Sequence, residues 1–397
     1  MRTAVLLLLA AAAAAQGRPA DPDVAAGRDA FDAGKYTDAI TCFARARLVD
    51  PLDWRGHAYT SLTLIQQAIR ETGVRRQDLV REAERVGGEL VKLDLCDFHD
   101  PLYRFIKGLV YSLEGDDVKA YVTFGDALKA PPEKFARYEE VELHRQLQRA
   151  CGVCGIRVAS LLLAAGRFQK AETEIVAADA LLPKDDPERA RLERVMAAIS
   201  ENLNKIEKAV SHLRACIALS KDPAVVDELT GTIALIYINN EELEKGREVL
   251  VHASKESRQP ELVAARCTLV VRDALLEGGA RLDDAMTQLR DAMRPYPQEQ
   301  VYRLVLLYRD LLLTRVGMRE AQTPEGQALL KEAVPIFLRE IERRPECPPL
   351  YFALYRVHKL LGNAEQERRY QDLHERRKKE FEHMDKYDQF GRPRCGN

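Results

Sequence analysis

Small and large apolar residues alternate along this chain at the spacing of one helix face. A small residue is followed four positions later by a large apolar residue, and three positions after that by a second small residue. Positions i, i+4 and i+7 form one stripe on an α-helix, so each copy predicts a helix with a narrow contact face. The copies are Ala39/Phe43/Ala46, Ala120/Phe124/Ala127, Ala171/Ile175/Ala178, Ala209/Leu213/Cys216, Gly246/Leu250/Ala253, Ala285/Leu289/Ala292 and, with a changed last member, Ala333/Phe337/Glu340.

Prolines mark the joints between these elements. A proline cannot continue the helix before it, and its fixed φ suits the first turn of the next helix. The pattern therefore predicts a helix, a turn, a second helix and a proline, repeated along the chain. Prolines stand at one common distance after the first small residue in five copies and slightly later in two: Pro51, Pro132, Pro183, Pro297 and Pro345, then Pro223 and Pro260.

The two best copies carry further matching residues. One contains Gly108, Tyr111, Gly115, Ala120, Phe124, Ala127 and Pro132, and the other Gly27, Gly34, Tyr36, Ala39, Phe43, Ala46 and Pro51. These residues resemble the tetratricopeptide repeat (TPR) family. The resemblance implies an all-α fold, a right-handed superhelical solenoid of seven to nine antiparallel helix pairs over residues 23–383. The clearest repeats are 23–51, 101–132, 152–183, 260–297 and 299–345.

Some stretches fit the repeat less closely. Residues 52–97 show only a weak second helix, and 70–78, 133–150 and 318–328 are expected to be longer helices or loop insertions. Residues 350–383 predict a last pair that ends in a charged helix, as a solenoid needs to cover its final apolar face.

The N-terminus has the pattern of a secretory signal. One cation, Arg2, precedes an apolar run from Ala4 to Ala15 that is too short to cross a hydrocarbon core of about 30 Å. Residues 1–15 are therefore predicted to be a signal peptide, 16–22 a linker and 384–397 a flexible tail. We expect cleavage after Ala15, no membrane insertion afterwards, and a periplasmic, extracellular or cell-surface location in a bacterium.

Charge gives no support to nucleic-acid binding. Sixty Lys and Arg face 62 Asp and Glu, a formal net charge of −2. The strongest basic run, Arg376 to Lys379, is interleaved with Glu375, Glu380 and Glu382, so we expect local pairing on a solvated helix face.

Eight cysteines in an exported chain permit disulfides without requiring them. Cys151 and Cys154 form the one C-x-x-C, and packing is the favoured interpretation, with a local disulfide or a metal role as the alternative. Cys96, His99 and Asp100 also cluster, but Asp100 before Pro101 predicts a helix cap there. We expect no metal site, and no other cofactor is expected.

The resemblance implies a concave groove lined by the first helix of each pair. Position by position, it assigns partner contacts to Phe105, Leu109, Ile156, Ser160, Leu235, Ile238 and Asn239. The alternative for these residues is contact with the next helix in the stack.

No nucleotide-binding or nucleophile motif is present, and no catalytic residue is assigned. The expected function is an exported scaffold or adaptor that binds a protein or peptide without catalysis. The competing hypotheses are a redox or metal-binding protein that uses Cys151 and Cys154, and a module that associates with its own copies.

The small positions can be tested by enlargement. Ala120→Leu is expected to destabilise the protein by roughly 1–3 kcal/mol, because a close-packed contact face cannot take up the added volume. An unchanged denaturation midpoint would contradict the assigned contact face.

Overall fold

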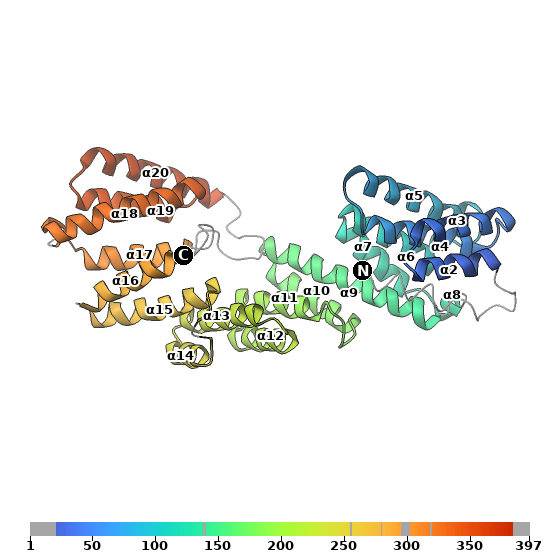
Figure 1. Ribbon diagram of the computed structural model, residues 1–397, viewed down its shortest axis with the longest axis horizontal. Coiled ribbons are helices and arrows are strands. Elements are labelled where there is room, and N and C mark those ends of the chain that lie inside the picture. Colours follow the sequence, from blue (N-terminus) through green and yellow to red (C-terminus); the bar gives the residue numbers. More distant parts are fainter. Residues whose placement is uncertain are drawn as a thin grey trace. The chain divides into compact units, whose positions relative to one another are not determined.

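The computed structural model describes residues 21–136, 138, 140–254, 256–278, 280–294, 302–317 and 320–383. The predicted signal peptide, most of the linker, the tail and Pro297 lie outside these residues. Every regular element in the described ranges is a helix (Figure 1). The all-α class predicted from the spacing of small and large residues is confirmed.

The chain divides into two compact units. Unit 1 extends to Leu161 and includes Gln169–Leu192, and unit 2 comprises Leu162–Phe168 and the chain from Glu193 onward. The helices of unit 1 are α2 (Pro22–Asp32), α3 (Tyr36–Val49), α4 (Trp54–Ala68), α5 (Gly73–Lys92), α6 (Pro101–Glu114), α7 (Asp117–Leu128), the short α8 (Pro132–Ala136), most of α9 (Glu140–Ala164) and α10 (Phe168–Leu181).

Unit 2 continues the alternation. Its helices are α11 (Arg189–Asn202, shared with unit 1), α12 (Ile206–Leu219), α13 (Pro223–Asn239), α14 (Leu243–Val251), α15 (Pro260–Glu277), α16 (Ala280–Met293), α17 (Tyr302–Arg315), α18 (Pro324–Arg343), α19 (Pro348–Leu360) and α20 (Ala364–His383). With α8 set aside, the described chain forms nine successive helix pairs, within the predicted range of seven to nine.

Six pairs share the same turn. Its central residue is in the left-handed region, and the next residue donates its N–H to the carbonyl five positions earlier at 2.8–3.0 Å. This is a Schellman ending, which satisfies carbonyls at the C-terminus of the first helix. The same local structure at equivalent positions shows that these pairs repeat one structural unit. The central residues are Gly34 (φ 74°), Gly115 (87°), Gly166 (71°), Asn204 (57°), Glu241 (63°) and Gly362 (72°).

The small residues allow the two helices of a pair to approach closely. A Cβ atom added to Gly108 would lie 2.7 Å from Cδ1 of Phe124, and one added to Gly27 would lie 2.7 Å from Cδ1 of Phe43. Real Cβ atoms do not come this close to a ring carbon. The two best sequence copies therefore share one packing contact in the structure.

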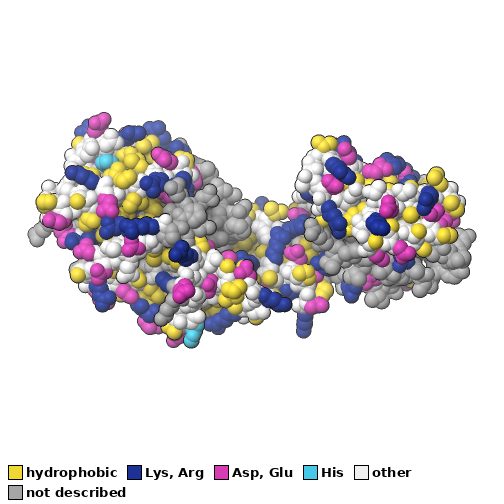
Figure 2. All heavy atoms as spheres, in the orientation of Figure 1, with side chains coloured by type: hydrophobic (Ala, Val, Ile, Leu, Met, Phe, Trp, Pro, Cys, Tyr) yellow, Lys and Arg dark blue, Asp and Glu magenta, His cyan; other side chains and the backbone are white. Residues whose placement is uncertain are grey.

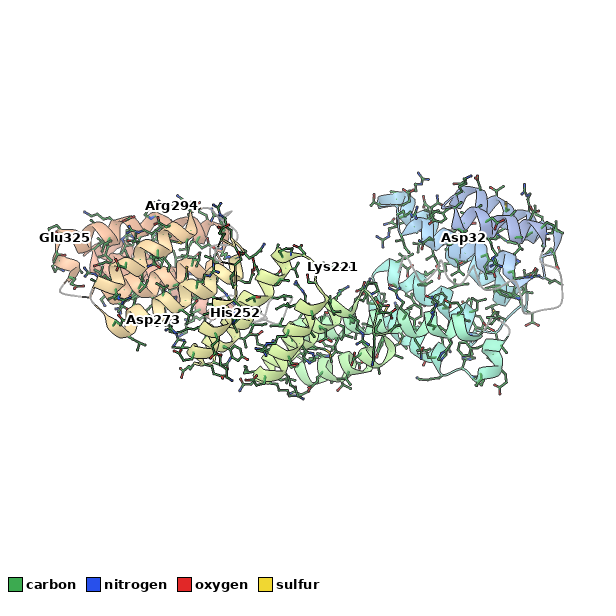
Figure 3. The ribbon with its side chains drawn as sticks, turned by 60° about the horizontal axis from the view of Figure 1, so that its bottom comes forward. Asp32, Lys221, His252, Asp273, Arg294 and Glu325 are labelled. Atoms are coloured by element: carbon green, nitrogen blue, oxygen red, sulfur yellow. The ribbon has the colours of Figure 1, made fainter. Side chains whose placement is uncertain are left out.

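Unit 2 shows an even closer approach between first helices of consecutive pairs. A Cβ on Gly231 of α13 would lie 2.6 Å from the Cα of Leu262 at the start of α15. Neighbouring α14 and α15 are joined by an ion pair between Arg247 and Asp273, the latter labelled in Figure 3.

The weak second helix predicted within residues 52–97 is in fact the 20-residue α5. Polar contacts hold it against α4, as the Ser61 hydroxyl donates to the Ala83 carbonyl at 2.7 Å and His57 Nδ1 lies 3.2 Å from a Glu89 oxygen. Periodicity of apolar residues does not register such contacts. The expected insertions appear as α8, the long α9 and a 3-10 turn at Glu320–Gln322 before α18.

The changed third member of the last copy is buried. Glu340 takes the place of a small residue on α18 and is 1% exposed. Its carboxylate pairs with Arg343 at 3.3 Å and Arg344 at 3.2 Å. Burial raises the pKa of Glu340, and the two guanidiniums oppose that rise.

One described segment, Glu142–Ala164 of α9, is long and apolar enough to cross a membrane by length and composition. However, 67% of its most apolar window is buried inside the protein, as expected of a core helix.

The glycine contact can be tested against a matched glycine. Gly108→Ala is expected to destabilise the protein by roughly 1–3 kcal/mol, because the methyl group collides with Phe124. Gly125→Ala on the paired helix α7 has nothing within 4 Å of its new Cβ and is expected to stabilise by up to about 1 kcal/mol. Urea denaturation of both variants measures the difference, and equal midpoints would contradict the contact.

Candidate functional site

Five of the seven predicted partner-contact residues lie in the hydrophobic core. Their exposed fractions are 0–5%: Phe105, Leu109, Ile156, Leu235 and Ile238. The ring of Phe105 packs 6.0 Å from that of Phe124 within the same helix pair. A partner that docks on the folded protein cannot reach these side chains. Their assignment to a binding groove is corrected to a packing role, the alternative that the sequence left open.

The other two predicted residues reach the surface. Ser160 on α9 is half-buried, and its hydroxyl donates to the Ile156 carbonyl at 2.8 Å. Asn239 is exposed as the last residue of α13. For these two residues, partner contact stays a prediction. They do not form one surface with the five buried residues.

Helix α4 of unit 1 is enclosed because its neighbours cover more than one face. On α4, every residue from Gly56 to Gln66 is buried, including the polar side chains of His57, Ser61 and Gln66. Helix α4 packs on α2, α3, α5 and α6. The spacing of residues on one helix cannot reveal that other helices lie across the same face. The sequence-based prediction therefore counted too many residues as lining an open groove.

The Cys151 and Cys154 thiols are free and buried in α9. Burial raises the pKa of Cys151 to about 12 and that of Cys154 to about 11. The thiolate is the reactive form of cysteine in redox and metal chemistry, so this environment gives no support to the redox or metal alternative.

The cluster of Cys96, His99 and Asp100 is used for structure. Asp100 caps α6 by accepting from the Leu102 N–H at 2.9 Å, and its other oxygen accepts from the Tyr138 hydroxyl at 2.9 Å. His99 Nδ1 lies 2.6 Å from Arg104 Nη2. The predicted helix cap is confirmed. Within the described ranges, no group of three or more His, Cys, Asp and Glu side chains is arranged to hold a metal ion.

Several buried or half-buried ionic groups also join helices. Glu89 on α5 receives Arg47 from α3 at 2.5 Å and His57 from α4, so one carboxylate ties three helices together. Asp186 is buried and pairs with Arg149 of α9 at 2.5 Å. Arg189 closes the end of α10 by donating to the Leu182 carbonyl at 2.5 Å and the Pro183 carbonyl at 2.9 Å. These groups stabilise helix joints and do not converge on a reaction centre.

Comparisons with known proteins address the fold. No protein-family model matches the chain, and no curated protein matches it. A tetratricopeptide repeat protein from Parabacteroides merdae aligns with TM-score 0.35 and 14% identity over 72% of this chain and 97% of its own. The TPR domain of P58(IPK) aligns with a TM-score of 0.25 and 17% identity, over 91% of this chain and 99% of its own. A human IFIT1 dimer with PPP-AAAA aligns with a TM-score of 0.31 and 15% identity, over 90% of this chain and 73% of its own.

The chain has a TPR-like fold. Its own helix pairs, their shared left-handed turns and the glycine-to-phenylalanine contacts establish this. The superpositions, with TM-scores of 0.35 and below, add no information about partners or activity.

The burial of the two thiols predicts slow alkylation. At mildly alkaline pH, iodoacetamide is expected to leave Cys151 and Cys154 unmodified in the native protein and to react with both after unfolding, because neither access nor thiolate is available in α9. The half-buried Cys42 and Cys96 are internal controls that react earlier. Peptide mapping by mass spectrometry follows each site, and fast native labelling of Cys151 would contradict its burial.

Proposed function

We propose that this protein is an exported scaffold that binds another protein or peptide and does no catalysis. The observation that supports the proposal most is the run of nine successive helix pairs in the described chain, six of which share one turn. Stacked helical repeats offer extended surfaces, and proteins of this construction bind partners without needing a reactive pocket. The ionic groups described above add to this, because they are engaged in holding helices together.

Export rests on the sequence of the first fifteen residues. The single cation and short apolar run ending in Ala13, Ala14 and Ala15 are typical of a secretory signal. We propose cleavage after Ala15 and a periplasmic or cell-surface location. Self-association stays an alternative, in which the partner is a second copy of the chain.

Partner binding can be tested by site-specific photocrosslinking in cells of the source organism. A photoreactive amino acid is placed singly at exposed or half-buried positions, including Ser160 and Asn239 from the predicted set and Leu276 and Lys331 from other helices. A scaffold is expected to give one discrete crosslinked product from a subset of positions and none from the rest, because a bound partner covers only part of the surface.

The same samples test the two other parts of the proposal. The mature chain is expected in the envelope or secreted fraction with Gln16 at its N-terminus. A product with twice the mass of the chain assigns the partner to a second copy. If no position gave a discrete crosslinked product, the proposed scaffold function would be contradicted.

A further inference from the structure

The last helix pair carries a partly exposed aromatic cluster, in which Tyr355 and His374 are half-buried and His374 Nδ1 lies 3.1 Å from the Pro348 carbonyl. Phe352 on α19 is 37% exposed, unlike the phenylalanines at the small-to-large contacts, which are fully buried. Its ring lies 6.0 Å from Tyr355 on the same helix and 5.4 Å from His374 on α20. Exposed apolar side chains that gather on one part of a surface can mark an interaction site.

The cluster is not what holds the pair together. The inner sides of α19 and α20 meet through His358 and Tyr370, whose rings stack with centroids 5.4 Å apart, and through the buried Leu350, Leu354 and Val357. Phe352 therefore contributes a ring to the surface in addition to a core that is already complete.

Cations surround these rings. Arg356 and Lys359 are exposed on α19, and Lys359 Nζ lies 5.7 Å from the centre of the Tyr355 ring. Positions 352, 356 and 359 form one stripe of the helix, and Lys378 lies one turn beyond His374 on α20. On the face drawn in Figure 2, hydrophobic side chains gather over α19 and α20 with Lys and Arg beside them.

Two of these cations, Arg356 and Lys359, are exposed to solvent. Among the side chains that the structure describes, no ion pair involves Arg356 or Lys359, whereas the neighbouring Arg343 and Arg344 both pair with Glu340. The local pairing expected for the basic run from Arg376 to Lys379 stays a prediction, because the side chains of Glu380 and Glu382 lie outside the described part of the chain. An unpaired positive charge beside an exposed ring provides a surface complementary to an acidic, partly apolar ligand.

We propose that this aromatic–basic patch (Phe352, Tyr355, Arg356, Lys359, His374 and Lys378) docks an acidic segment of a partner protein. The proposal rests on the scaffold function proposed above and assigns a place and a chemistry to it. An apolar or aromatic side chain of the partner packs on Phe352. Flanking carboxylates of the partner bind Arg356 and Lys359.

Single-stranded nucleic acid also binds to rings and cations, but the charge around the patch favours an acidic peptide. The exposed residues Asp372 and Glu375 lie on α20, the same helix that carries His374 and Lys378. A phosphate backbone needs a continuous positive groove, and these carboxylates interrupt one. A short peptide with separate carboxylates can place them on Arg356 and Lys359 alone.

Fluorescence anisotropy with the full mature chain tests the patch. The probes are a labelled peptide with one phenylalanine flanked by glutamates, the same peptide with lysines in place of the glutamates, and oligo-dT. The glutamate peptide is expected to bind and the lysine peptide not to bind. Arg356→Glu with Lys359→Glu is expected to weaken binding by about tenfold or more, and Phe352→Ala by several-fold.

A charge-matched control keeps the result specific. Lys331→Glu with Arg339→Glu changes two exposed cations on α18 and is expected to leave binding unchanged. Circular dichroism checks that each variant keeps its helices, and Phe352→Tyr is a conservative variant that retains the ring and the binding.

Three results would overturn the patch: no binding of the glutamate peptide, equal weakening by the control pair, or tighter binding of oligo-dT than of the peptide. Photocrosslinking separates this failure from failure of the scaffold. If a discrete partner product persists without peptide binding, only the patch is wrong. If both are lost, the scaffold proposal fails too.

Discussion

The close approach of two helices within a pair is the constraint on which the rest of the structure depends. Phe124 and Phe43 each lie so near the opposite helix that only glycine fits across from them, at Gly108 and Gly27. The rings fill the space that the missing side chains leave, and interiors packed to crystal-like density tolerate little change there. The glycine-to-phenylalanine contact occurs in two pairs and the left-handed turn in six, so similar local structure is used repeatedly along the chain.

This packing also explains why five of the seven predicted groove residues are not available to a partner. A first helix that contacts its own partner helix and the next pair has little free surface left, and in unit 1 α4 is buried nearly all around. Side chains such as Phe105 and Leu109 complete the core. Under the proposed function, recognition falls to positions where the repeat leaves a side chain uncovered, and we propose the last pair as such a place.

The fold could be predicted from the sequence because its determinants are local. Spacing of small and large residues, prolines at joints and glycines at turns all lie within one pair. The burial of single residues could not be predicted, because it depends on how the neighbouring helices and pairs lie across a helix. Helix α5 was underestimated because Ser61 and His57 hold it through polar contacts. The stripe of Phe352, Arg356 and Lys359 was not singled out from the sequence. Its exposure could have been inferred there, because an apolar contact face does not carry two cations.

The most direct test of this account is the urea denaturation of Phe105→Ala beside Asn239→Ala, with hydrogen exchange in α6 as a local probe. If Phe105 is core, its truncation is expected to cost about 3–5 kcal/mol and to speed exchange in α6, while Asn239→Ala stays within about 0.5 kcal/mol of the parent. If Phe105→Ala left stability and exchange unchanged, the ring would not be a core residue, and the packing account would be contradicted.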